Sequence, residues 1–227
     1  MFLSARRSPR TASRSRAALW LLICLGALCT AAPVQTPAQN ISVSVHTPPS
    51  DKHRTAIFAG GCFWCMEEPF DRLRGVISTR VGYIGGSTVD PTYKQITTGR
   101  TGHAEAVEIT YDPDRVDYGQ LLAVFWRQID PTDPGGQFVD RGSQYRTAIF
   151  YIDAEQQRLA EASRDAMKAS GRFGPARLVT EIVEAGTFYP AEDYHQDYYK
   201  KSSSRYKYYR FHSGRDRYLD RIWSDER

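Results

Sequence analysis

The chain reads Ala56-Ile57-Phe58-Ala59-Gly60-Gly61-Cys62-Phe63-Trp64-Cys65 where a strand pattern gives way to a helix pattern. The apolar run before the glycines predicts a short buried strand, and the residues from Met66 to Leu73 predict a helix. The two glycines allow a tight backbone turn and a close approach of a ligand. A thiol in the first turn of a helix faces the positive end of the helix dipole, which favours its thiolate. The spacing therefore predicts that Cys62 is a nucleophile and that Cys65 lies close enough to form a disulfide with it.

Alternating strand and helix patterns continue along the chain from this junction. Apolar runs predict strands at residues 54–59, 76–82, 105–111, 146–152 and 178–184. Helical spacing predicts helices at 62–73, 117–127 and 154–169, with Asp117 and Asp153 as N-terminal caps. The order predicts an α/β (α+β) fold. We expect a single domain, a two-layer sandwich of helices on one mixed sheet that resembles a ferredoxin-like plait, with a long irregular C-terminal tail from about residue 200. Short helical pieces are expected near 191–200 and near 216–223.

The first 32 residues have the pattern of a secretory signal peptide. Five arginines precede an apolar run from Ala17 to Leu28, and the small residues Thr30-Ala31-Ala32 follow it. The apolar run has about 12 residues, whereas a membrane span needs about 20. Residues 33–51 are rich in Pro, Thr and Ser and predict a flexible linker before the domain at 52–227. We therefore expect a periplasmic or secreted protein.

Removing the leader changes what composition implies. The full chain carries a net charge of +4, but the leader holds five arginines and no acid, so the mature chain is near neutral at about −1. Of four cysteines only Cys62 and Cys65 remain, too few for a disulfide-stabilised scaffold. The pair could be catalytic, a structural disulfide or part of a metal site. A metal needs more ligands than one such pair, and the five histidines show no partner spacing, so we expect none.

The basic, tyrosine-rich stretch from Lys200 to Arg221 admits two interpretations. Basic residues interleaved with aromatics can bind nucleic acid, but export of the protein argues against that partner. The alternative is a tail that covers the domain with its tyrosine rings packed and its arginine head groups in water. We expect this second arrangement and no nucleic-acid partner.

Several other residues could serve a thiol at position 62. Phe63 and Trp64 would line an apolar pocket, although packing into the core is an equal possibility for Phe63. Glu105 follows a polar loop at the start of a strand, where apolar walls would raise its pKa and let it donate a proton near neutral pH. Three more candidates lie near Gly- and Pro-rich loops, where sites often assemble, although the position of each taken alone favours a structural role: Tyr93, Asp140 and Tyr145.

Four separated blocks resemble the A-type peptide-methionine sulfoxide reductase family. In family order they are Gly60–Cys65, Gly99–Val107, Asp140–Arg146 and Ala191–Tyr198. A Cys-X-X-Cys pair alone also occurs in thioredoxin-like proteins, but four blocks in order are specific. The resemblance implies thiol-dependent reduction of the S epimer of methionine sulfoxide, free or in proteins, as protein repair.

The resemblance also implies a role for each candidate. Cys62 would attack the sulfoxide sulfur and become a sulfenic acid. Glu105 would be the acid. Phe63 and Trp64 would hold the methyl group of the substrate. Tyr93 and Tyr145, with Glu105, would hydrogen-bond to the sulfoxide oxygen, and Asp140 would shape the site.

The sulfenic acid on Cys62 must then be removed. No cysteine follows Cys65 in the sequence, so Cys65 is the internal candidate and a Cys62–Cys65 disulfide the expected intermediate; direct attack by an external thiol is the alternative. We expect no bound cofactor, a thioredoxin-like protein or a dithiol as reductant, and a monomer. Two other functions stay open at this point: a thiol-disulfide oxidoreductase acting on protein disulfides, and a non-catalytic binding module.

Overall fold

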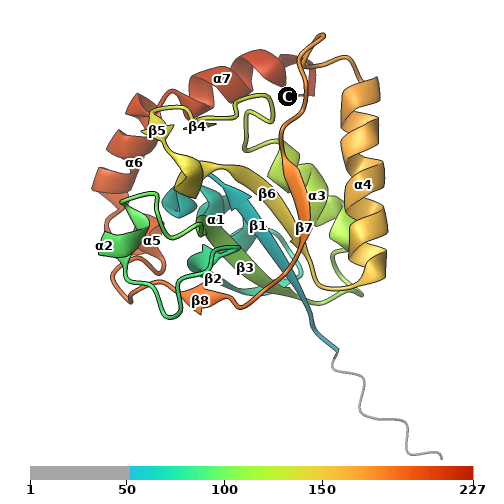
Figure 1. Ribbon diagram of the computed structural model, residues 1–227. Coiled ribbons are helices and arrows are strands. Elements are labelled where there is room, and N and C mark those ends of the chain that lie inside the picture. Colours follow the sequence, from blue (N-terminus) through green and yellow to red (C-terminus); the bar gives the residue numbers. More distant parts are fainter. Residues whose placement is uncertain (1–51, 227) are drawn as a thin grey trace, which may run out of the picture. The chain divides into compact units, whose positions relative to one another are not determined.

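A computed structural model of the protein describes residues 52–226. The predicted signal peptide at 1–32 and linker at 33–51 lie outside the described residues. Six strands form one sheet in the order β7-β6-β1-β3-β2-β8 (Figure 1). The six strands are β1 (Arg54–Gly60), β2 (Val76–Ile84), β3 (Ala104–Tyr111), β6 (Thr147–Tyr151), β7 (Glu181–Glu184) and β8 (Tyr189–Pro190). Only β6 and β7 pair in parallel, so the sheet is mixed as predicted.

The core of the sheet has ferredoxin-like topology. In chain order the first elements are β1, α1 (Phe63–Asp71), β2, β3, α3 (Tyr118–Trp126) and β6. Their strands pair antiparallel in the order β6-β1-β3-β2, which is the arrangement of a split βαβ plait. The predicted α/β class and ferredoxin-like plait are therefore confirmed. The helix α4 (Ala154–Ala169) returns the chain to β7 at one edge of the sheet (Figure 1).

The helices cover one face of the sheet. Alternate residues of β1 separate the two faces: Ala56 and Phe58 belong to the main core with residues of α1, α3 and α4, whereas Ile57 and Ala59 belong to a smaller cluster on the other face. That second face is covered by Ala185 and by Phe188, from the segment between β7 and β8.

Local chemistry determines where the helices begin. Asp117 caps α3 by accepting the N–H of Gln120 at 2.7 Å, and Asp153 caps α4 by accepting the N–H of Gln156 at 2.8 Å, as predicted. The connection between β2 and β3 holds the short helix α2 (Tyr93–Ile96). The connection between α3 and β6 holds the hairpin of β4 (Gly136–Gln137) and β5 (Asp140–Arg141).

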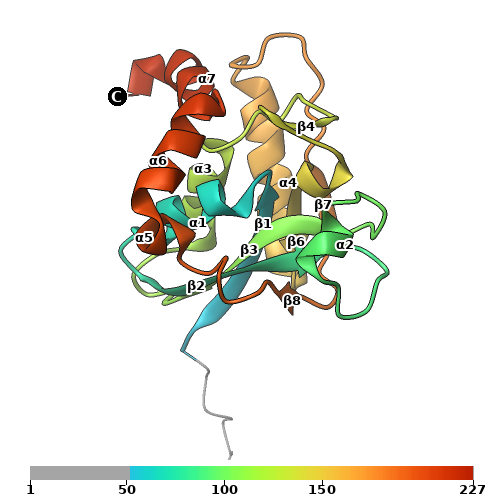
Figure 2. The same cartoon turned by 90° about the vertical axis from the view of Figure 1, so that its left-hand side faces the viewer.

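The C-terminal segment is helical, so the predicted long irregular tail is wrong. It forms α5 (Tyr198–Lys201), α6 (Ser203–His212), α7 (Arg215–Ile222) and the 3-10 turn Ser224–Glu226. α5 packs against α1, α6 contacts α5, and α7 contacts α6 (Figures 1 and 2). The helical piece expected near 216–223 is α7, whereas α6 was not expected because it carries few aliphatic residues; tertiary packing rather than an apolar face stabilises it. Between residues 52 and 226 no helix combines the length and apolar character needed to cross a bilayer.

Candidate active site

The strand-to-helix junction holds both thiols in the interior. β1 ends at Gly60 and α1 begins at Phe63, with Cys62 at the N-cap position. Gly61 has φ +83°, and a Cβ there would lie 2.6 Å from the Cβ of Gln137, so only glycine fits without strain. Cys62 is 7% exposed and Cys65 is 1% exposed, and both are free thiols.

Glu105 lies against the same junction. It is the second residue of β3 and is 2% exposed. Its Oε2 accepts the backbone N–H of Phe63 at 3.1 Å, so the carboxyl group lies beside the residue that follows Cys62. Burial raises the pKa of Glu105 to about 8, and the charges of Asp140 and Cys65 act in the same direction, whereas the Phe63 N–H opposes them. At neutral pH most Glu105 side chains are therefore protonated and can donate a proton.

Tyr93 and Tyr145 belong to this electrostatic environment. Tyr93 opens α2 and Tyr145 lies in the 3-10 turn Ser143–Tyr145. Burial is the main cause that raises the pKa of Tyr93 to about 12 and that of Tyr145 well above its ordinary value, with the charges of Glu105 and Cys62 adding to both. Both hydroxyls stay protonated at neutral pH and can donate hydrogen bonds.

The two thiols interact, and their order of ionisation differs from the prediction. Burial raises the pKa of Cys62 well above its ordinary value, and so do the hydrogen bond with Cys65 and the charges of Cys65, Glu105 and Asp140. The pKa of Cys65 falls to about 7, first because Cys62 donates that hydrogen bond and, against burial, because Arg215 and Arg210 are near. The prediction that the helix dipole favours a Cys62 thiolate is therefore wrong for the substrate-free protein. Burial of the thiol is the main cause of the raised pKa of Cys62.

Asp140 is held by a residue that the sequence did not identify. Asp140 opens β5 and is half-buried, and the hydroxyl of Tyr209 on α6 donates to both of its carboxylate oxygens at 2.6 Å. Burial raises the pKa of Asp140, while this hydrogen bond and the charge of Arg215 oppose the rise. The C-terminal helices thus reach the site at Asp140.

Aromatic rings form the wall beside Cys62. Trp64 stacks on Tyr198 with ring centroids 3.8 Å apart, and its indole N–H donates to Nδ1 of the buried His195 at 3.1 Å. Trp64 borders an open groove of about 690 Å³, whose other lining residues include Tyr93, His195 and Tyr209. Phe63 is fully buried in a core cluster with Val81, Tyr83, Ile96 and Ala191, so it packs in the core, while its ring centroid also lies 5.0 Å from that of His195.

Comparison with known proteins identifies the family to which the chain belongs. The sequence profile of the family described as peptide methionine sulfoxide reductase matches residues 54–227. The chain belongs to this family. It is 53% identical over 177 residues to the peptide methionine sulfoxide reductase MsrA of Bacillus pumilus, covering 78% of this chain and 99% of that relative. It is 55% identical over 168 residues to the MsrA of Listeria innocua, covering 74% and 94%.

Solved structures of the family agree. Methionine sulfoxide reductase A of Corynebacterium diphtheriae superposes with a TM-score of 0.63 at 35% identity, over 68% of this chain and 77% of that one. Mxr1 of Saccharomyces cerevisiae in its reduced form superposes with a TM-score of 0.62 at 28% identity, over 67% and 87%. The family resemblance and the enzyme class predicted from the four blocks, a peptide-methionine sulfoxide reductase, are confirmed.

The reductase site combines predicted residues with residues that the sequence did not single out. Four of the predicted residues share one environment, since Glu105 hydrogen-bonds to Phe63 and its charge acts on Tyr93 and Tyr145. His195 stands in the fourth sequence block, which was a signal for it, whereas no pattern pointed to Tyr209. Within residues 52–226, no cluster of three or more His, Cys, Asp or Glu has the arrangement of a metal site.

Proposed function

We propose that this reductase acts on the S epimer of methionine sulfoxide, with Cys62 as nucleophile and Glu105 as acid. The observation that carries the proposal is the Phe63 N–H to Glu105 Oε2 hydrogen bond of 3.1 Å, because it supports a buried carboxyl group acting on the same small guest as Cys62. The proposed epimer follows from the family resemblance. The groove beside Trp64 supports a peptide as substrate, since it offers room outside the buried thiols.

The first step transfers oxygen from the substrate to Cys62. One proton is shared between the two thiols, and its movement to Cys65 leaves Cys62 as the thiolate, which attacks the sulfoxide sulfur. Glu105 gives its proton to the sulfoxide oxygen, because oxide itself is a poor leaving group. The protonated oxygen leaves the substrate sulfur as hydroxide, and this hydroxide attacks the Cys62 sulfur and breaks the new bond between Cys62 and the substrate sulfur. The products are methionine, a sulfenic acid on Cys62 and an ionised Glu105. Tyr93 and Tyr145 supply hydrogen bonds to the oxygen.

The second step forms a disulfide. Cys65 attacks the sulfur of the Cys62 sulfenic acid, the sulfur–oxygen bond breaks, and the hydroxide leaves as water with the proton that Cys65 gives up. The sulfenic sulfur is reduced and the Cys65 sulfur is oxidised, so the electrons balance. The position of Cys65 one helical turn from Cys62, with its N–H donating to the Cys62 carbonyl at 3.0 Å, supports this step.

A thioredoxin-like protein or a small dithiol is the proposed reductant of the disulfide. We propose that the protein works in the periplasm or outside the cell, on the strength of the signal-peptide pattern in residues 1–32. In that setting the donor is a thioredoxin-like protein supplied with electrons through the membrane. Mass spectrometry of the protein isolated from the exported fraction tests both points, since it reports the N-terminus and, after one equivalent of sulfoxide, the sulfur linkage.

Chiral substrates test the function directly. The enzyme is incubated with each epimer of a methyl sulfoxide and dithiothreitol, and the loss of each epimer is measured. We expect loss of the S epimer only, with Cys62→Ser as the inactive control. Failure to consume either epimer with Cys62 intact contradicts the proposal, and efficient reduction of insulin disulfides instead would favour the thiol-disulfide oxidoreductase interpretation.

A further inference from the structure

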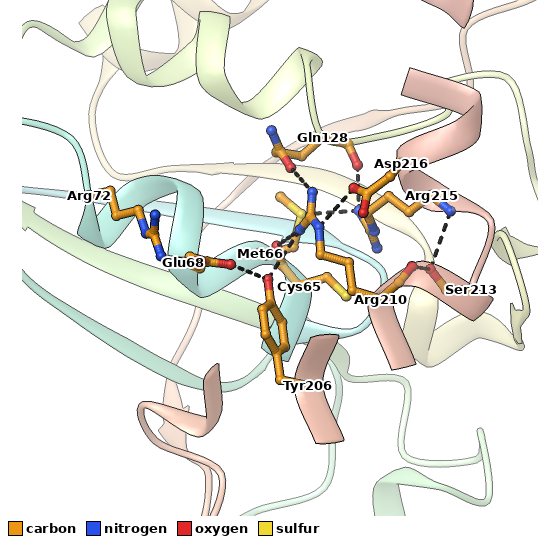
Figure 3. Close-up of polar contacts among 10 residues, drawn as sticks. All are labelled: Cys65, Met66, Glu68, Arg72, Gln128, Tyr206, Arg210, Ser213, Arg215 and Asp216. Carbon is orange, nitrogen blue, oxygen red and sulfur yellow. Dashed lines mark hydrogen bonds and ion pairs between the residues drawn. The ribbon is translucent and has the colours of Figure 1, made fainter. Parts of the chain in front are cut away.

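Two arginines of the C-terminal helices reach the back of the catalytic junction. Arg210 comes from α6 and Arg215 is the first residue of α7. Figure 3 shows the guanidinium group of Arg210 at Cys65 and Gln128, and that of Arg215 at Met66 and Gln128. Arg215 is 1% exposed, so the expectation that the arginine head groups of this segment lie in water is wrong for it. An arginine this deeply buried calls for a physical reason.

Arg210 replaces a hydrogen bond that the helix cannot make. Pro69 lies inside α1 and has no N–H, so the carbonyl of Cys65, four residues earlier, lacks its helical donor. Nη1 of Arg210 donates to that carbonyl at 3.0 Å. The charge of Arg210 is partly neutralised, because its Nε donates to the carboxylate of Asp216 at 2.8 Å.

Arg215 has only uncharged acceptors. Its guanidinium donates to the carbonyls of Gly60, at 3.0 Å, and Gln128, and it lies 3.5 Å from the sulfur of Met66. Its remaining close contact is with the ring of Phe138. Among residues 52–226 no carboxylate forms an ion pair with Arg215. A buried charge without an ion-pair partner is costly. The negative charges on which Arg215 acts are those of Asp140, which it does not contact, and of the Cys65 sulfur when it ionises.

Other groups also act on the Cys65 sulfur. Cys62 hydrogen-bonds to it, and the charge of Asp140, which the hydrogen bond from the Tyr209 hydroxyl favours, opposes its ionisation. Seven titratable groups interact electrostatically or by hydrogen bonding with Cys65: Cys62, Glu105, Asp140, Tyr206, Tyr209, Arg210 and Arg215. Of these, the thiol of Cys62 is consumed when it becomes a sulfenic acid, so its hydrogen bond changes in the first step. The two arginines are the cations that remain.

We propose that Arg215, supported by Arg210, is a positioning residue for the second step. After Cys62 has been oxidised, the two arginines hold Cys65 as a thiolate. This inference rests on the proposed function. Cys65 first releases to solvent the proton that it took from Cys62. The thiolate then attacks the sulfenic sulfur, the sulfur–oxygen bond breaks, and the hydroxide leaves and takes a proton from solvent to become water. The hydrogen bonds from Arg215 to the Gly60 carbonyl and from Arg210 to the Cys65 carbonyl hold the end of β1 and the start of α1 in place for this attack.

A thiolate titration tests the inference without sulfoxide reduction. In the Cys62→Ser background, absorbance at ~240 nm is followed against pH, with Cys62→Ser/Cys65→Ser subtracted, because the thiolate rather than the thiol is the reactive species. Arg215→Met should move the Cys65 midpoint upward by about one pH unit or more, and Arg215→Lys by less. Asp216→Asn, which removes the partner of Arg210, should move it downward. Arg158→Met, on the exposed face of α4, is the matched control and should leave it in place.

A single-turnover experiment then connects the titration to the reaction. With Arg215→Met, disulfide formation at pH 7 should slow by about fivefold or more, which is the loss of thiolate expected for one pH unit. The inference is overturned if folded Arg215→Met keeps the parent midpoint, or, where that variant does not fold, if Asp216→Asn fails to lower it. Absence of methionine formation by the parent enzyme would instead contradict the proposed function and leave the titration result intact.

Discussion

Replacement of Glu105 by glutamine separates acid catalysis from binding. The amide has the shape of the carboxylic acid and its oxygen can still accept the Phe63 N–H, so the local geometry should survive. The amide has no acidic proton that it can donate to the sulfoxide oxygen. Because a positioned general acid contributes about 10²–10⁴-fold, methionine formation in a single turnover should slow by about that factor.

The pH profile of the same step carries the sharper prediction. The parent needs a proton on Glu105, whose pKa is about 8, and a negative charge in the thiol pair, where the pKa of Cys65 is about 7. Its rate should therefore fall on the alkaline side above about pH 8 and on the acid side below about pH 7. Glu105→Gln should lose the alkaline decline and keep the acid one. Rapid-quench measurement of methionine from pH 6 to 10 checks this. An unchanged alkaline decline, or a rate within about threefold of the parent, would refute the acid role.

The stability of the variant provides its own control. The pKa of Glu105 is raised from 4.5 to about 8 in the folded state. Because the folded state holds the Glu105 proton more tightly than the unfolded state, the raised pKa contributes stability that is fully present below pH 4.5. That contribution is lost as the pH rises to about 8. At about 1.4 kcal/mol per pH unit, the upper bound of the loss is about 5 kcal/mol. In urea unfolding, Glu105→Gln should thus gain stability relative to the parent between pH 5 and 8.5, which excludes unfolding as the cause of a slow rate.

Three further substitutions test other parts of the site. Cys65→Ser should release one methionine per enzyme and leave a sulfenic acid on Cys62, visible by mass spectrometry as one added oxygen; parent-level turnover with a protein donor would show that Cys65 is not the resolving thiol. Gly61→Ala places a Cβ 2.6 Å from the Cβ of Gln137 at φ +83°, and should lower the free energy of urea unfolding by about 1–3 kcal/mol; an unchanged midpoint contradicts the steric argument. His195→Leu leaves the Trp64 indole N–H without its acceptor and should lower kcat/KM for methionine sulfoxide by about tenfold, chiefly through KM; an unaltered KM would mean that His195 does not orient Trp64.

The ferredoxin-like core was predictable because its signals are local. Alternation in strands and acidic caps at Asp117 and Asp153 depend on neighbours in sequence, and the structure repeats them. The residues of the site came from short blocks whose chemistry is also local: a thiol beside glycines and a carboxyl at the start of a strand. The bond between Glu105 and Phe63 joins residues 42 positions apart, and only the pairing of β1 with β3 brings them together.

The ionisation of the thiols could not be predicted in the same way. A helix dipole is implied by sequence, but the burial that opposes it depends on what covers the junction. Cys62 occupies the N-cap and faces Glu105 and Asp140, while Cys65 lies in the first turn and is acted on by Arg210 and Arg215. The lowered pKa of Cys65 is due first to its hydrogen bond with Cys62, and then to the charges of Arg215 and Arg210, which α7 and α6 bring to the junction.

The C-terminal arginines show where sequence reasoning stops. Arginine is mostly a surface residue, and a stretch with few apolar residues predicts exposure, so the tail interpretation was the natural one. One local sign pointed elsewhere: Pro69 frees the Cys65 carbonyl, and a buried carbonyl without a donor must find one. The sequence predicts that need but not the donor, since any later residue could meet it. Arg210 meets it from 145 residues away, and the adjoining turn into α7 then carries the charge of Arg215 to the catalytic junction.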